Sequence, residues 1–97
     1  MKHVVVVNYH DKNENSIFTS VYNNPSNAWD VVGQLMSRLI DSNRYLIHDD
    51  ELGCMVQAPW EIDIKNHLSE QDFEGALCIF NTHAIKDSLQ IELKEVR

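Results

Sequence analysis

Hydrophobic residues follow a strand-like spacing at the start of the chain. Val4 to Val7 form a β-branched run of the kind found in buried strands. The polar residues 11–15 (DKNEN) follow, and residues 17–22 (IFTSVY) again have the composition of a strand. The pattern predicts that the two strands form a β-hairpin with 11–15 as its loop.

The most regular helical pattern begins after the sequence NNPS. Apolar residues then recur at 3.6-residue spacing up to about Ser42, with polar residues on the opposite side, which predicts an amphipathic helix. Its start has two interpretations. Asn24 can cap the helix with Pro25 at the first helical position, or Ser26 can cap it one turn later.

After Arg44 the hydrophobic spacing changes to strict alternation. YLIHD is short and apolar, and DELG has the composition of a turn. From Cys54 to Ile64 every second residue is apolar, which favours a strand over a helix. We therefore predict a second hairpin, in which Pro59 must lie at a bulge or on an unpaired edge.

A four-residue turn fixes the register of this second hairpin. It places Asp49 opposite Cys54 and His48 opposite Met55, and paired residues share a face of the sheet. Cys54 then points into the core with Ile47, whereas His48 points to the other face. Because the two side chains diverge, we expect no Cys–His catalytic pair, and the stretch HDDELGCM is interpreted as a turn with carboxylates at its tip.

The C-terminal third combines a helix and a strand. Ser69 and Asp72 have the spacing of a capping box, and apolar residues follow at helical spacing from Phe73 to Ala84. Residues 89–94 alternate between apolar and polar side chains, which predicts a final amphipathic strand.

The predicted order of elements is β-β-α-β-β-α-β. We expect a single domain over residues 1–97, built as a two-layer α+β sandwich with a mainly antiparallel sheet and both helices on one face. Without its first strand, the order is that of a ferredoxin-like fold, in which residues 17–22 would have strands on both sides. A tight hairpin through 11–15 competes for one of those sides, so the strand order stays open.

The net charge at pH 7 is −7, and the whole excess falls in one segment. Residues 49–74 hold eight carboxylates against Lys65 alone, whereas acids and bases cancel in 1–48 and in 75–97. Affinity for nucleic acid comes largely from clustered Lys and Arg, so direct binding to nucleic acid is disfavoured. A basic protein partner is favoured instead.

The N-terminus and the cysteines bear on location. The apolar run near the N-terminus has four residues, where a signal peptide needs roughly 7–15 and a spanning helix about 20. Cys54 and Cys78 lie 24 positions apart and form no C-x-x-C motif. We expect a cytoplasmic protein with two reduced thiols and no membrane anchor.

Candidate chemistry is sparse. The five histidines include no H-x-H or H-x-x-x-H pair, and His10 and His48, each followed by Asp, could share a metal only if the hairpin tips met. Glu61 and Asp63 would lie about 7 Å apart on the predicted strand, but no pocket or pKa-shifting neighbour is predicted beside them. No phosphate-binding loop or nucleophile motif occurs. We expect no metal, no cofactor and no enzymatic activity.

The remaining candidate is a partner-binding surface on the open face of the second hairpin. Its residues are His48, Asp49, Asp50, Glu51, Met55, Gln57, Glu61 and Asp63. Apolar side chains framed by carboxylates are typical of a protein-binding patch with electrostatic steering, although a solvated sheet face has a similar composition.

Two functional hypotheses follow. The first is a small acidic non-catalytic inhibitor that blocks a basic, nucleic-acid-handling protein such as a nuclease. Immunity proteins and phage anti-defence proteins are of this physical type. The alternative is a ferredoxin-like homo-oligomer that binds a small molecule or serves as an enzyme subunit.

Overall fold

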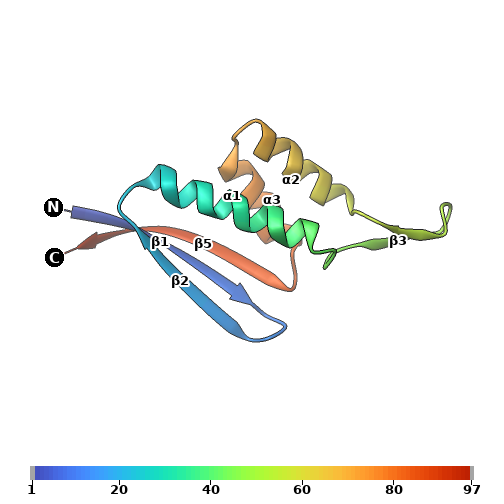
Figure 1. Cartoon of the computed structure of the whole chain (residues 1–97), viewed down its shortest axis with the longest axis horizontal. Coiled ribbons are helices and arrows are strands. Elements are labelled where there is room, and N and C mark those ends of the chain that lie inside the picture. The colour runs from blue at the N-terminus through green and yellow to red at the C-terminus, as the bar shows by residue number, and fades with distance from the viewer. Residues whose placement is uncertain (1, 97) are drawn as a thin grey trace.

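The computed structural model describes residues 2–96, and one helix is added to the predicted order. Figure 1 shows the helices on one side of the main sheet, and the strands in both sheets are antiparallel, which confirms the two-layer α+β sandwich. In chain order the elements are β1 (Lys2–Asp11), β2 (Ser16–Tyr22), α1 (Pro25–Asp41), β3 (Ile47–Asp49), β4 (Cys54–Val56), α2 (Pro59–Ser69), α3 (Phe73–His83) and β5 (Asp87–Val96).

The main sheet has three strands in the order β2-β1-β5. The first hairpin closes at the pair Asp11–Ser16, so β1 and β2 are joined by a tight loop. β5 pairs with β1 along its full length, as far as Asp11 opposite Asp87. The central strand is therefore β1, and residues 17–22 lie at an edge with β1 as their one neighbouring strand among the described residues, not between two strands as in the ferredoxin-like order.

The core lies between the sheet and the helices. Val5 and Val7 of β1 point toward the helices and are almost completely buried, which explains the apolar run at the start of the chain. The sheet also contributes Leu89 of β5, and all three helices contribute buried residues from the other layer. The helical contributors are Ala28, Val32, Met36, Leu39, Ile40, Ile64, Ala76, Leu77 and Phe80.

Helix α1 begins with Asn24 as its cap. The Asn24 side-chain oxygen accepts a hydrogen bond of 2.9 Å from the N–H of Ser26, and Pro25 occupies the first helical position. Further along, a Cβ on Gly33 would lie 2.7 Å from a ring carbon of Phe73. Glycine at this position therefore allows α1 and α3 to approach closely.

Helix α2 replaces the long second strand predicted after Cys54, and that prediction is wrong beyond Val56. Pro59 stands at the first helical position, and the Glu61 side chain turns back to accept a hydrogen bond of 3.1 Å from the N–H of Ala58. Ala58 has no side-chain oxygen, so only this half of a capping box is made. Pro59 and Glu61 are ordinary helix-start residues, and they override the alternation of apolar positions.

Helix α3 starts later than the predicted capping box places it. Ser69 is the last residue of α2, and Asp72 is the cap of α3, accepting a hydrogen bond of 3.1 Å from the N–H of Gly75. The turn between the helices includes Gln71 at a φ of 60°. The predicted helix is therefore present as α3 with a later start, and only α2 takes the place of the predicted strand.

Candidate functional site

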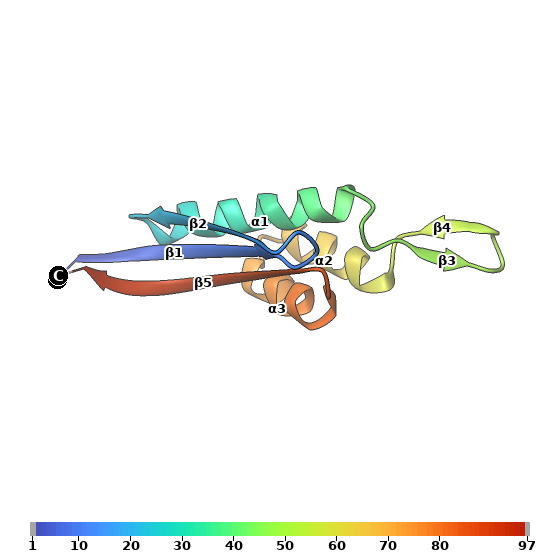
Figure 2. The same cartoon turned by 90° about the horizontal axis from the view of Figure 1, so that it is seen from below.

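The hairpin of β3 and β4 carries most of the predicted partner-binding residues. Its register pairs His48 with Met55 and Asp49 with Cys54, as the sequence predicts. Figures 1 and 2 show that the hairpin extends from one end of the body and does not join the main sheet. Cys54 is exposed, so its predicted place in the core is wrong. The reason is that a two-stranded ribbon with nothing packed on it has no buried face.

Asp49 builds the turn at the hairpin tip. Its side-chain oxygen Oδ1 accepts hydrogen bonds from the N–H groups of Glu51, at 2.9 Å, and Leu52, at 3.1 Å. Its backbone carbonyl accepts a third, of 2.8 Å, from the N–H of Gly53. Gly53 has a φ of +67°, which glycine adopts without strain. These bonds hold the tip in a defined turn conformation. The Asp49 side chain is used within the turn and does not point freely outward.

The tip presents acidic and apolar side chains together. The Asp50 side chain is 99% exposed, and its Oδ1 lies 3.0 Å from Nδ1 of His48. Glu51 is exposed as well, and Leu52 between the turn residues is 69% exposed. Residues 47–56 contain three carboxylates and no Lys or Arg. The electrostatic field at the tip is therefore negative, with an apolar contact point inside it.

Three other predicted surface residues lie on or before α2. Glu61 is completely buried because it caps the helix start, so it cannot contact a partner and its predicted place on the surface is wrong. Asp63 is exposed on α2, not on a strand face beside Glu61. Gln57 is half-buried, and its side-chain oxygen accepts a hydrogen bond of 3.4 Å from Lys65.

The acidic segment 49–74 does not form one continuous face. Asp49, Asp50 and Glu51 lie at the hairpin tip, whereas residues 70–74 lie beyond the far end of α2 (Figure 1). α2 has 11 residues, which corresponds to a length of about 16 Å. The hairpin tip is therefore a separate acidic site.

The root of the hairpin is held by a buried network of charged and hydroxyl groups. Asp87 is fully buried and accepts hydrogen bonds from the hydroxyls of Tyr9, at 2.6 Å, and Tyr45, at 2.5 Å. Both terminal nitrogens of Arg44 donate to Asp11, at 3.2 and 3.3 Å. Arg44 Nε lies 3.3 Å from Asp87 but makes no aligned hydrogen bond, so that contact is one of charge alone. The network joins β1 and β5 to the residues that lead into β3.

The network shifts the pKa values of its members. The hydrogen bonds from Arg44 hold the pKa of the Asp11 carboxyl below its usual value of 3.8. Burial, followed by the hydrogen bond to Asp87, raises the pKa of the Tyr9 and Tyr45 hydroxyls well above 10. Both tyrosines are therefore neutral hydrogen-bond donors at physiological pH.

A shallow hollow of about 270 Å³ lies beside the hairpin root. Its wall includes Trp60, whose ring stacks on His83 at 5.7 Å and meets the Tyr45 ring edge-on at 5.1 Å. Trp60 thus packs beside the core, with Tyr45 and His83 as its aromatic neighbours.

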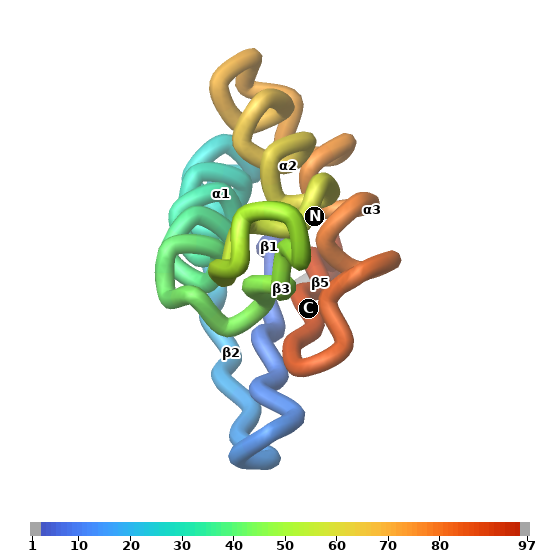
Figure 3. The backbone as a smooth tube through the Cα atoms, turned by 90° about the vertical axis from the view of Figure 1, so that its right-hand side faces the viewer, coloured from blue at the N-terminus to red at the C-terminus, as the bar shows by residue number. Residues whose placement is uncertain are grey.

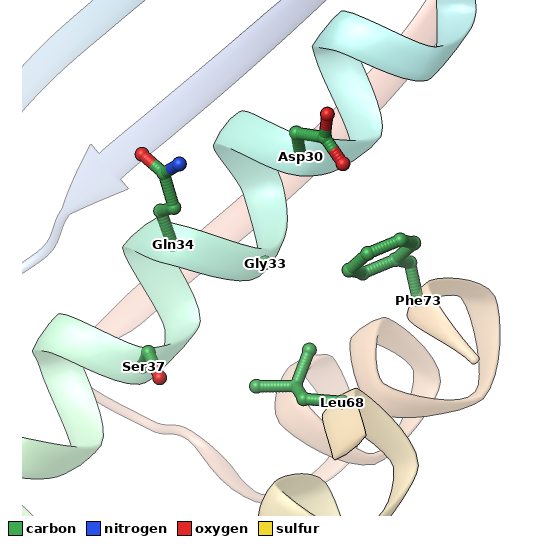
Figure 4. A pocket seen from close by; sticks show the side chains of 6 residues that line it. All are labelled: Asp30, Gly33, Gln34, Ser37, Leu68 and Phe73. Atoms are coloured by element: carbon green, nitrogen blue, oxygen red, sulfur yellow. The ribbon is translucent and has the colours of Figure 1, made fainter. Parts of the chain in front are cut away.

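A second hollow, of about 290 Å³, lies between α1 and the α2–α3 pair. Figure 4 shows Leu68 and Phe73 pointing toward α1 at Gly33, with Asp30 and Ser37 on the helix above and below. Small-molecule sites have volumes of about 300–1,000 Å³ and enclose most of the ligand. Both hollows are smaller and open, which favours the hairpin as the candidate site.

The histidines do not gather into a cluster. His10 lies 3.3 Å from the side-chain oxygen of Asn15 in the first hairpin, and His67 lies 2.8 Å from Asp72 between α2 and α3. Within residues 2–96, no three His, Cys, Asp or Glu side chains are placed to hold one metal ion. No helix in this range combines the length and apolar character needed to cross a membrane.

Comparisons with family models, with curated proteins and with solved structures found no match to this chain. Sequence reasoning found the hairpin tip but missed its root, where Asp87 and Arg44 meet from positions 43 residues apart. No local spacing in the sequence signals such a contact.

Proposed function

We propose that this protein is a small acidic binding protein, without catalytic activity, that docks its β3–β4 hairpin on a basic surface of another protein. The observation that carries the proposal is the projecting tip, where Asp50 and Glu51 flank the turn beside the exposed Leu52. An apolar contact point with exposed carboxylates around it is the usual composition of a steered protein interface.

The nature of the partner follows from the charge. Carboxylates on a narrow projection can enter a groove lined with Lys and Arg, which is the surface that nucleic-acid-handling proteins present to phosphate. A protein docked in such a groove blocks nucleic acid from it. The protein would then be a cytoplasmic inhibitor of the immunity or anti-defence type, and its partner a nuclease or another nucleic-acid-binding protein.

The rigid root supports this role. Just before β3 begins, Tyr45 is hydrogen-bonded to the buried Asp87 and Arg44 forms an ion pair with it, so the hairpin leaves the body from a fixed point. Asp49 holds the tip in one turn conformation. Pre-ordering of this kind lowers the entropic cost of binding.

The test is affinity capture from the native host with two matched variants. The wild-type chain should retain a basic protein that is released by added DNA, because the two compete for one groove. The variant Asp50→Lys/Glu51→Lys should lose that protein, whereas Asp30→Lys/Glu70→Lys, equal in charge change but distant from the tip, should keep it. Capture of the same protein by the tip variant would contradict the proposal.

A further inference from the structure

The two edges of the main sheet differ. At the outer edge of β5, α3 lies beside the first part of the strand, where the Asn81 side-chain amide donates to the Leu89 carbonyl at 2.8 Å and accepts from the Leu89 N–H at 3.1 Å (Figure 2). Asn81 thus occupies the backbone groups that a further strand would use. Within the described residues no strand pairs with the outer edge of β2, although α1 lies over part of this strand (Figure 3), and five consecutive residues, 17–21, are exposed.

β2 also lacks the features that normally protect an exposed edge. Such strands usually carry Lys, Pro or a bulge, because their unpaired N–H and C=O groups bind other strands. Residues 15–29 contain no charged side chain, and β2 itself contains no Pro. Ile17 is 67% exposed, Phe18 60% and Val21 61%. Neither a charged side chain nor a Pro therefore prevents another strand from pairing with the backbone of β2.

We propose that β2 pairs with β2 of a second copy of this chain, antiparallel and about a twofold axis at Thr19. This register sets Ile17 opposite Val21 of the partner copy and Phe18 opposite Ser20. Both exposed apolar residues of the open sheet face then meet an apolar residue. Two three-stranded sheets would become one continuous sheet across the dimer.

Two observations favour a second copy over a strand from another protein. The pairing is symmetric and brings Ile17 of each copy against Val21 of the other, and a strand without charge adds no repulsion between two chains of net charge −7. Because the two β2 edges pair about a twofold axis, the contact uses the same surface on both copies and closes as a dimer. The β3–β4 hairpins remain free, so this proposal is independent of the proposed function.

The first test is the mass in solution. Sedimentation should give twice the chain mass of 11.2 kDa. The variant Ile17→Lys/Val21→Lys should sediment as a folded monomer, while Leu93→Lys, an equally exposed residue on β5, should remain a dimer. A monomeric wild type, or equal dissociation by the control, would overturn the proposal.

The second test fixes the register, in a chain with Cys54→Ser and Cys78→Ser. Thr19→Cys should form a covalent dimer under mild oxidation, because directly opposed Cβ atoms lie about 4.5–5.5 Å apart. Ile17→Cys should not, because the two copies of that residue would lie about 14 Å apart along the strands. Equal cross-linking of both variants would contradict edge pairing and indicate random or face-to-face contact.

Discussion

Tyr45 donates its hydroxyl proton to the buried carboxylate of Asp87 across 2.5 Å. Tyr45 stands two residues before β3, so this bond fixes where the acidic hairpin leaves the body. The side chain of Asp87 is completely buried and also accepts from Tyr9. The hairpin therefore combines an anchored root with an exposed, ordered tip.

Removing the Tyr45 hydroxyl should destabilise the fold. Tyr45→Phe leaves the buried Asp87 with one donor fewer, and we expect the free energy of unfolding to fall by about 1–3 kcal/mol. Urea denaturation followed by circular dichroism measures this loss. Tyr22→Phe is the control, because its hydroxyl takes no part in the network, and an equal loss for both variants would count against the anchoring role.

Stability should also fall at alkaline pH. The pKa values of Tyr9 and Tyr45 are raised in the folded protein, so above about pH 10 the unfolded chain loses their protons first. The unfolded state then binds fewer protons than the folded state, so the free energy of unfolding decreases as pH rises above about 10. Below about pH 10 both states keep these protons, and the stabilisation is fully present. Urea midpoints measured across this range should fall less steeply for Tyr9→Phe/Tyr45→Phe, and parallel curves would disprove the assignment.

Replacing Asp49 should loosen the turn at the hairpin tip and leave the global stability almost unchanged. Asp49→Ala removes the acceptor of the Glu51 and Leu52 N–H groups, so hydrogen exchange at these two amides should accelerate. The global free energy of unfolding should change by less than about 0.5 kcal/mol, since the hairpin lies outside the core. Asp50→Ala, whose carboxylate bonds neither amide, should leave exchange unchanged. Unaltered exchange in Asp49→Ala would refute the role given to Asp49.

Gly33→Ala should destabilise the protein although alanine is the better helix former. The propensity gain of about 1 kcal/mol is opposed by a Cβ placed 2.7 Å from Phe73, and overpacking costs about 1–3 kcal/mol. Thermal unfolding should show a lower midpoint for Gly33→Ala. Adding Phe73→Leu should recover part of the loss, and a stabilised single variant would show that α1 and α3 separate easily.

The sequence predicted those features that depend on neighbouring residues. The hairpin register was predictable because Asp49 and Gly53 have side-chain and backbone preferences that define a turn within five residues. Helix α2 was missed because apolar residues alternate by chance from Cys54 to Ile64, while the helix-start signals of Pro59 and Glu61 are local and easily outweighed. The anchoring network was beyond reach, since Asp11, Arg44 and Asp87 meet only after the chain has folded.

Association kinetics with the captured partner test the central claim most directly. Rim charges act mainly on encounter rate, so Asp50→Lys/Glu51→Lys should lower the association rate constant by on the order of tenfold at low salt. The wild-type rate should itself fall as salt is raised, because screening acts over about 8–10 Å. Asp30→Lys/Glu70→Lys should associate at close to the wild-type rate. If this control slows association as much as the tip variant does, net charge alone drives binding and the hairpin is not the binding site.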